Sequence, residues 1–192
     1  MNRALRVIKL GGSLLGRSDL AARFDGWLDV QPPATNVIIV GGGRIVEALR
    51  ELDHVHKLAP AAAHALAIDA MRVTAKLAAT LLSRPVVDTL DVGSETGHMT
   101  VVLDVSRILA IHEPTAPGVR LEPGWHVTSD SIAARVAVML GANELVLLKS
   151  APAGSEDITA LAARGYVDEF FPRIAREIAT VRFVELGAEP RL

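Results

Sequence analysis

The sequence has no cysteine and few aromatic residues. Its 192 residues include two Trp, one Tyr and four Phe. Without cysteine the chain can form neither a disulfide nor a thiolate site, which fits a reducing compartment, and we expect the cytoplasm. With so few aromatic side chains, the core must be built mainly from Ala, Val, Leu and Ile, as in tightly packed α/β proteins.

Strong net charge and long apolar runs are also missing. The formal net charge is −2, and there is no block of Lys and Arg to follow a nucleic-acid backbone, so we expect no nucleic-acid partner. The apolar run before Gly11 is too short for a signal peptide or a membrane span, so we expect no targeting segment and no membrane contact. A chain of this length fits a single domain, 1–192.

Short apolar segments alternate with segments of helical periodicity along most of the chain. This alternation, with short glycine-containing connections, predicts an α/β fold: a three-layer αβα sandwich with a central, mostly parallel sheet. The expected strands are 5–10, 37–40, 86–90, 99–105, 144–148 and 180–186, and the expected helices are 18–28, 43–52, 59–82, 129–140, 157–163 and 172–179. Three prolines and two glycines predict a loop over 112–124.

The first motif with potential chemistry is KLGGS, residues 9–13. Glycines at the end of a strand let backbone N–H groups converge on an anion, the helix that follows adds a favourable dipole, and Lys9 adds a full positive charge. Short glycine patterns also occur in plain turns, and no Gly-Lys-Ser/Thr follows to make a Walker A loop. From this motif alone, the phosphate site and the plain turn stay equally open.

The second motif, VGGGR at 40–44, contains three consecutive glycines. Such a run is conformationally costly unless the backbone must approach something closely or adopt positive φ. Neither glycine cluster has the G-x-G-x-x-G spacing of a dinucleotide fold. Both follow predicted strands, and ligands of parallel sheets bind at the carboxyl ends of strands. Two such turns indicate a polyphosphate lying between a donor and an acceptor.

Asp130 in TSDS and Lys149 at the end of LVLLK are candidate charged groups. Ser129 or Asp130 caps the predicted helix, and the Asp130 carboxylate could instead orient lysines or a metal near phosphates. Lys149 ends a buried strand, although its stem could reach solvent without any role. His54 and His56 alternate like a strand metal pair, but no acidic residue accompanies them at helical metal spacing, and we expect no metal site.

In this order, KLGGS, IIVGGGR, TSDSIAARVAVMLGANELVLLKS and GYVDEFFPRIA resemble the motifs of the amino acid kinase family, which includes acetylglutamate, glutamate and uridylate kinases. The resemblance covers nearly the whole chain. It implies phosphoryl transfer from ATP with Mg²⁺ to an acceptor oxygen, by positioning and charge neutralisation and without a covalent enzyme intermediate. It also implies a homo-oligomer, and the alanine-rich helix 59–82 is suited to a dimer interface.

The resemblance assigns roles to individual residues. Lys9 would bind the transferring phosphate, Lys149 would reach the nucleotide phosphates, and Asp130 would organise both lysines. The implied phosphate- and nucleotide-binding residues are Gly11, Gly12, Ser13, Ser150, Tyr166 and Arg173, with the loop 149–156 bordering the nucleotide. The implied acceptor-binding residues are Gly41, Gly42, Gly43, Arg44, Asp69 and Arg72.

The segment GYVDEFFPR departs from the family pattern. Many members have a GGMxxK segment that supplies a second catalytic lysine, and Arg173 stands about where that lysine would be. Arg173 either replaces this positive charge or is a solvated helix residue. The departure leaves open a non-catalytic nucleotide-binding protein, for storage or regulation, that keeps the glycine loops.

The compact size, GWHVTSDSIAA and LLKS resemble most the small branch that includes (5-(aminomethyl)furan-3-yl)methyl phosphate kinase, of methanofuran-type cofactor biosynthesis, which makes a diphosphate from a phosphate monoester. An anionic acceptor requires added positive charge, for which Arg44 and Arg72 are candidates, and Asp69 could meet an amine. Arg72 and Asp69 could equally belong to surface ion pairs. The alternative is a kinase of the same fold that acts on an amino acid or a nucleoside monophosphate.

Overall fold

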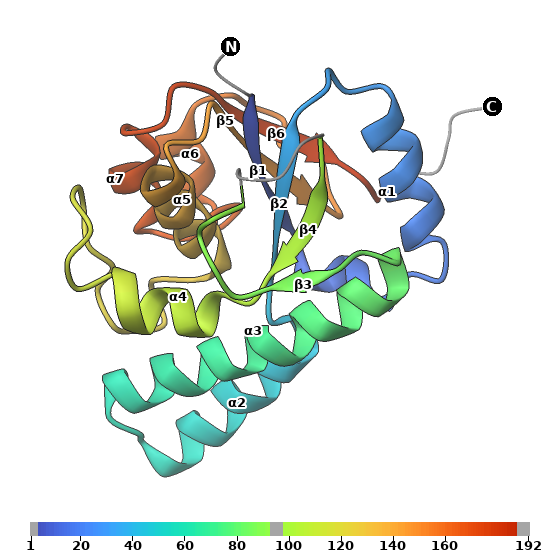
Figure 1. Cartoon of the computed structure of the whole chain (residues 1–192). Helices are drawn as coiled ribbons and strands as arrows, with labels where there is room; N and C mark the ends of the chain where they lie inside the picture. Colours follow the sequence, from blue (N-terminus) through green and yellow to red (C-terminus); the bar gives the residue numbers. More distant parts are fainter. Residues whose placement is uncertain (1–3, 93–97, 188–192) are drawn as a thin grey trace.

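The computed structural model describes residues 4–92 and 98–187, which form a six-stranded sheet between two layers of helices (Figure 1). The strands lie in the order β3-β4-β2-β1-β5-β6, and every neighbouring pair is parallel. Their bounds are β1 (Leu5–Leu10), β2 (Thr35–Val40), β3 (Val86–Val87), β4 (Thr100–Leu103), β5 (Glu144–Lys149) and β6 (Val181–Glu185). The predicted three-layer α/β architecture is confirmed.

The helices lie where the periodicity placed them, with three differences. Their bounds are η1 (Gly12–Gly16), α1 (Leu20–Asp29), α2 (Gly43–His56), α3 (Pro60–Leu82), α4 (Val105–His112), α5 (Ser129–Leu140), α6 (Ile158–Ala163) and α7 (Phe171–Ala175). The strand expected over 99–105 ends at Leu103, because Asp104 accepts a hydrogen bond from the Ser106 amide at 3.0 Å and caps α4, which was not predicted. Thr128, rather than Ser129 or Asp130, caps α5, and α7 is shorter than expected.

The sheet is apolar on both faces, because alternate residues of each central strand enter different cores. Val7, Val37 and Leu145 pack on the face that α4 to α7 cover, and all three are fully buried. The opposite core contains Ile8 and Val146 of the same strands, together with side chains of α1 and α3. The central strands, and the residues at their carboxyl ends, are therefore held on both sides.

Helices α2 and α3 lie side by side at one edge of the molecule (Figure 1). None of the α2 residues is buried, although its sequence has an apolar face, and Ile45 and Leu52 stay exposed. His54 and His56 lie in its last turn, so the strand-like reading of this pair is wrong. Within 4–92 and 98–187 no group of three or more His, Cys, Asp or Glu could hold a metal ion.

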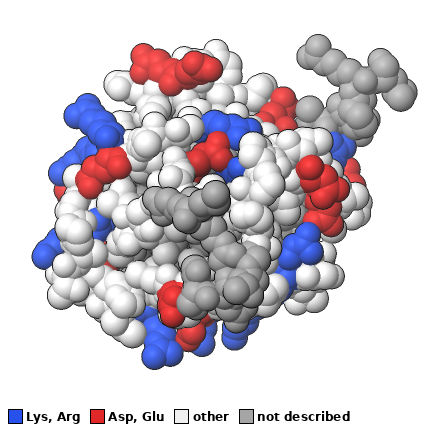
Figure 2. Space-filling model, turned by 45° about the horizontal axis from the view of Figure 1, so that its top comes forward, with Lys and Arg blue, Asp and Glu red and all other residues white. Residues whose placement is uncertain are grey.

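Charged residues of both signs lie on the face of the molecule drawn in Figure 2. On the face drawn in Figure 2, Lys and Arg are interspersed with Asp, Glu and uncharged residues. Among the helices of the described residues, none is both long and apolar enough to cross a membrane.

The two glycine motifs touch each other at the carboxyl ends of β1 and β2. These strands pair in register, with Leu10 opposite Val40, so their turns begin at the same level of the sheet. A Cβ atom on Gly12 would lie 2.3 Å from the Gly43 amide nitrogen, and Gly43 itself has a φ of 53°. The glycines are thus required by the close approach of two backbones.

Replacing Gly12 with Ala should lower the free energy of unfolding by about 1–3 kcal/mol, since the new Cβ meets backbone that cannot rotate away. Gly16→Ala in the same helix is the control, because a Cβ there has no heavy atom within 4 Å. Urea denaturation of both variants measures the difference. Equal stability of the two variants would contradict the tight loop contact.

Candidate phosphoryl-transfer site

A carboxylate lies between two lysines at the carboxyl ends of β1 and β5. The Lys9 Nζ is 2.8 Å from Asp130 Oδ1, and the Lys149 Nζ is 2.6 Å from Asp130 Oδ2. The adjacent strands β1 and β5 supply the lysines, and the first turn of α5 supplies the aspartate. The side chains of Lys9, Asp130 and Lys149 are only 6%, 5% and 15% exposed. The structure therefore brings together the three residues predicted to be catalytic, and each Asp130 oxygen faces a lysine.

Burial and charge act in opposite directions on these groups. Burial disfavours the ionised Asp130 carboxylate, but Lys9 and Lys149 outweigh it and hold the pKa of Asp130 below its ordinary value. Burial and the nearby Lys9 ammonium lower the pKa of Lys149, whereas Asp130 favours its protonated form. The cluster of two ammonium groups and one carboxylate carries a net charge of +1, which suits an anionic ligand.

The loop after β5 joins this cluster. Besides Asp130, the Lys149 Nζ donates to the Tyr166 carbonyl oxygen at 2.6 Å, and the Tyr166 hydroxyl donates to the Ala151 carbonyl at 3.0 Å. The Ser13 hydroxyl donates to the Ser150 hydroxyl at 3.1 Å, which joins the first glycine loop to the turn after β5. Four predicted residues thus lie beside one another around the end of β5: Ser13, Lys149, Ser150 and Tyr166.

Two glycine amides are already used by the sheet. The Gly11 N–H donates to Leu148 O and the Gly41 N–H donates to Leu10 O, both at 2.9 Å. These bonds continue the pairing of β1 with its two neighbours past the strand ends. The ligand-binding role of Gly11 and Gly41 therefore stays a prediction, and it depends on their lack of a side chain rather than on these amides.

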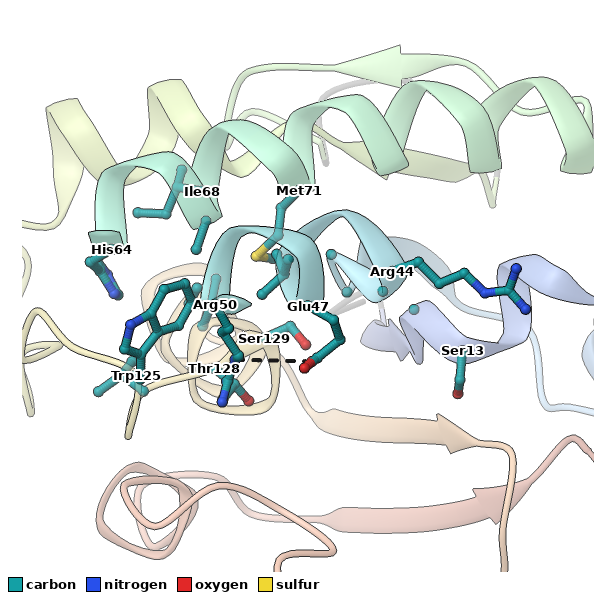
Figure 3. A pocket seen from close by; sticks show the side chains of 18 of the residues that line it. Ser13, Arg44, Glu47, Arg50, His64, Ile68, Met71, Trp125, Thr128 and Ser129 are labelled. Carbon is teal, nitrogen blue, oxygen red and sulfur yellow. Dashed lines mark ion pairs between the residues drawn. The ribbon is translucent and has the colours of Figure 1, made fainter. Parts of the chain in front are cut away.

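A cavity of about 440 Å³ opens beside the glycine loops, between α2, α3 and the turn before α5 (Figure 3). Ile68 and Met71 of α3 supply apolar surface, and Thr128 and Ser129 supply hydroxyls. The predicted acceptor residues Gly41, Gly42, Gly43 and Arg44 all line this cavity. Figure 3 shows His64 and Trp125 at one end and Arg44 extending from the other, towards η1.

The far end of the cavity has a fixed aromatic wall. The Trp125 Nε1–H donates to Asp53 Oδ2 at 2.7 Å, and the Arg50 guanidinium lies 4.8 Å from the centre of the Trp125 ring. Glu47 pairs with Arg50 at 3.9 Å along the same helix. Sequence reasoning missed Glu47 and Arg50, because the predicted helix over 43–52 gave no sign of which of its residues face a cavity; Val46 lines the cavity as well.

Three other predicted residues lie outside this cavity. Arg72 forms an ion pair with Asp104 at 3.0 Å, and Asp69 is exposed on α3. Arg173 pairs with Glu122 at 2.6 Å, and its guanidinium stacks 4.5 Å from the Phe170 ring centre. Their roles in binding remain predictions that the cavity lining does not support.

A second hollow, of about 760 Å³, lies on the other side of Lys149. The loop after β5 and the strand β6 line it, through Pro152–Glu156 and Val181–Glu185. That the loop 149–156 borders the nucleotide stays a prediction. The two hollows lie beside different elements, one beside α2 and α3 and the other beside β6.

A model of the amino acid kinase family matches residues 4–153. The chain belongs to this family. No curated protein sequence matches the chain at a significant level.

Solved structures of amino acid kinase folds superpose on nearly the whole chain. Uridylate kinase from Archaeoglobus fulgidus has a TM-score of 0.59 and 17% identity, over 91% of this chain and 88% of that one. Aspartate kinase from Synechocystis has a TM-score of 0.62 and 19% identity, over 94% of this chain and 38% of that one. Carbamate kinase from Giardia lamblia, solved with AMP-PNP, has a TM-score of 0.51 and 12% identity, over 97% and 93%. At these identities the similarity shows the fold.

Asp130→Asn should destabilise this family member by about 3–5 kcal/mol at pH 7, because it leaves two buried ammonium groups without a carboxylate between them. Since the folded-state pKa of Asp130 is lowered, its contribution is complete above the unfolded pKa and is lost as the pH falls through the folded one. Urea denaturation at several pH values measures both effects.

Asp25→Asn is the matched control, because the carboxylate of Asp25 pairs with Arg84 in a partly exposed position. Its loss should cost less than about 1 kcal/mol. Equal destabilisation by the two substitutions would contradict the central role of the Asp130 ion pairs.

Proposed function

We propose that this protein is an ATP-dependent small-molecule kinase. The observation that carries the proposal is the buried Lys9–Asp130–Lys149 cluster beside two touching glycine loops, at the carboxyl ends of adjacent strands. Phosphoryl transfer needs positive charge around the equatorial oxygens of the transferred group, and little other chemistry from the protein. Lys9 and Lys149 would supply that charge, and Asp130 would hold them in place.

In this reaction the bond between the γ-phosphorus and the β,γ-bridging oxygen breaks, and its electron pair leaves with ADP. A new bond forms from the acceptor oxygen to the same phosphorus. Mg²⁺ would neutralise charge between the phosphates, and it would be held mainly by the phosphates themselves, as is usual for nucleotide-bound magnesium.

The acceptor oxygen should already be ionised. Asp130 is kept as a carboxylate by two lysines and has a lowered pKa, which makes it a weak base for removing a proton from an alcohol. A phosphate monoester or a carboxylate needs no such base. This argues for an anionic acceptor group.

Within this class we propose (5-(aminomethyl)furan-3-yl)methyl phosphate as the acceptor and a diphosphate as the product, in methanofuran-type cofactor biosynthesis. The cavity offers an indole wall at Trp125 for a flat ring, Glu47 for an ammonium group and, at the opposite end, the Arg44 guanidinium group for a phosphate. Glu47 thus takes the amine-binding role that we had assigned to Asp69.

We further propose that the protein is a homo-oligomer. Four exposed apolar side chains of α3 fall on one helical stripe: Leu66, Val73, Leu77 and Leu81. Ile45 and Leu52 of the neighbouring helix α2 are exposed as well. A second copy of the chain would bury this surface.

The proposed activity is tested by measuring ADP release with Mg-ATP and a panel of acceptors. The panel contains the aminomethylfuran phosphate, uridine monophosphate, aspartate, glutamate, and the aminomethylfuran alcohol without phosphate. We expect ADP release that depends on the phosphorylated furan and is much slower with the alcohol. Preference for another acceptor would replace the substrate, and nucleotide binding without acceptor-dependent ADP release would favour the non-catalytic alternative.

Lys9→Ala should lower kcat on the order of 100-fold or more, with a smaller change in KM for ATP, because Lys9 acts on charge that develops during transfer. Lys76→Ala is the control, since Lys76 is an exposed lysine of α3 outside the site. An unchanged kcat of the Lys9 variant would refute this role.

Val73→Glu should dissociate the oligomer, because it places a charge in the middle of the α3 stripe. Light scattering gives the mass of the variant and of Val30→Glu, which places the same charge on an exposed apolar residue after α1. An oligomer that survives Val73→Glu, or a wild-type chain that is monomeric, argues against this interface.

A further inference from the structure

The Asp168 carboxylate lies outside the ion cluster, but it is bonded to the helix end that carries Asp130. Asp168 lies in the segment between α6 and α7 and accepts hydrogen bonds from six donors. Four belong to residues 37 and 40 positions earlier: the amide and hydroxyl of Thr128, at 3.1 and 2.8 Å, and the amide and hydroxyl of Ser131. The other two are the amides of Phe170 and Phe171.

The two residues of α5 and its cap that bond to Asp168 lie before and after Asp130 in the sequence. Thr128 is the N-cap of α5, and Ser131 lies in its first turn. The Thr128 hydroxyl donates to Asp168 and accepts a hydrogen bond from the Asp130 amide at 3.5 Å. A carboxylate that accepts hydrogen bonds from both backbone amides and side-chain hydroxyls fixes the rotation of the helix end and its position along the helix axis. The direction in which Asp130 points at the lysines depends on that helix end.

The same segment also holds Lys149. The Tyr166 carbonyl, two residues before Asp168, accepts the second short hydrogen bond of the Lys149 ammonium group. One short stretch of chain, 166–168, therefore contacts both the aspartate-bearing helix end and the lysine. Its own position is fixed by the bonds of Asp168.

We propose, on the basis of the proposed function, that Asp168 is a positioning residue of the phosphoryl-transfer site. Through the end of α5 and the Tyr166 carbonyl, it sets the positions of Asp130 and Lys149 relative to each other. In this role Asp168 acts through Thr128, Ser131 and the Tyr166 carbonyl rather than by contact with a substrate. Its negative charge has a second effect, because Asp168 is one of the groups that favour the protonated form of Lys149.

Several neighbouring groups change the pKa of Lys149. Burial and the Lys9 ammonium lower its pKa, while Asp130 and Asp168 raise it. The Tyr166 ring lies 5.0 Å from the Nζ, and Glu185 is the neighbour of Lys149 in β6. Removing the charge of Asp168 therefore moves the Lys149 titration to lower pH and brings the alkaline loss of activity to lower pH as well.

The test is Asp168→Asn, which keeps the shape of the side chain and removes its charge and half of its acceptor capacity. The chain has only four lysines, Lys9, Lys57, Lys76 and Lys149, so carbon-13 NMR of labelled lysine can follow Lys149 directly, with Lys149→Arg assigning its signal. We expect the Lys149 midpoint to move to lower pH, and kcat to fall on the order of 10- to 100-fold with little change in KM for ATP. Asp25→Asn, the same change in the ion pair with Arg84, should alter neither.

Thr128→Val distinguishes the effect of Asp168 on the position of Asp130 from the effect of its charge on Lys149. It also provides a test if the Asp168→Asn variant does not fold. It removes the hydroxyl between Asp168 and the Asp130 amide but keeps the carboxylate, so kcat should fall while the Lys149 midpoint stays unchanged. An unchanged Lys149 midpoint in Asp168→Asn, or an unchanged kcat in Thr128→Val, would overturn the inference.

The NMR titration needs no turnover, so it distinguishes two failures. If the wild-type chain has no kinase activity but its Lys149 midpoint depends on Asp168, the proposed function fails and the coupling of Asp168 to the cluster stands. If wild-type activity is present and the titration does not respond to Asp168, the kinase assignment stands and the positioning role is refuted.

Discussion

Two ammonium groups share one buried carboxylate in this molecule, and the strand ends, the capped helix and the glycine loops are arranged around that interaction. Lys9 and Lys149 reach Asp130 from adjacent parallel strands, at 2.8 and 2.6 Å. Burying three charges is costly, and one ammonium remains without an equivalent carboxylate. A phosphoryl group would balance this charge, and the low exposure of the cluster to water would strengthen its interaction with such an anion.

The backbone around the cluster determines where that anion can lie. Gly12 and Gly43 touch in a way that leaves no room for a Cβ, which closes the gap between the turns of β1 and β2. The cavity proposed to bind the acceptor opens on the side of α2 and α3, and a second hollow opens beside β6. Asp168 then fixes the helix end that carries Asp130. In the proposed reaction, each feature would restrict the geometry, and the protein would contribute position and charge.

Sequence reasoning found the elements with local signals and missed those that depend on distant contacts. Buried strands and glycine turns can be predicted from residues that are neighbours in the sequence. Lys9, Asp130 and Lys149 could therefore be placed at the ends of strands and helices. The helix α4 had a usable signal, Asp104 two residues before Ser106, which is a typical N-cap pair. The contact of Asp168 with the end of α5 had none, because Ser131 and Thr128 lie 37 and 40 residues earlier in the chain. Glu47 and Arg50 were missed because α2 buries none of its residues, so its apolar periodicity did not show which face meets the cavity.

A crystal structure with ADP, Mg²⁺, aluminium fluoride and the aminomethylfuran phosphate tests the central claim most directly. The fluoride complex mimics the phosphoryl group during transfer. It should lie between the ammonium groups of Lys9 and Lys149, next to Gly12, with ADP on the β6 side and the acceptor in the cavity between α2 and α3. A fluoride complex bound away from both lysines, or ADP bound in the cavity between α2 and α3, would contradict the account.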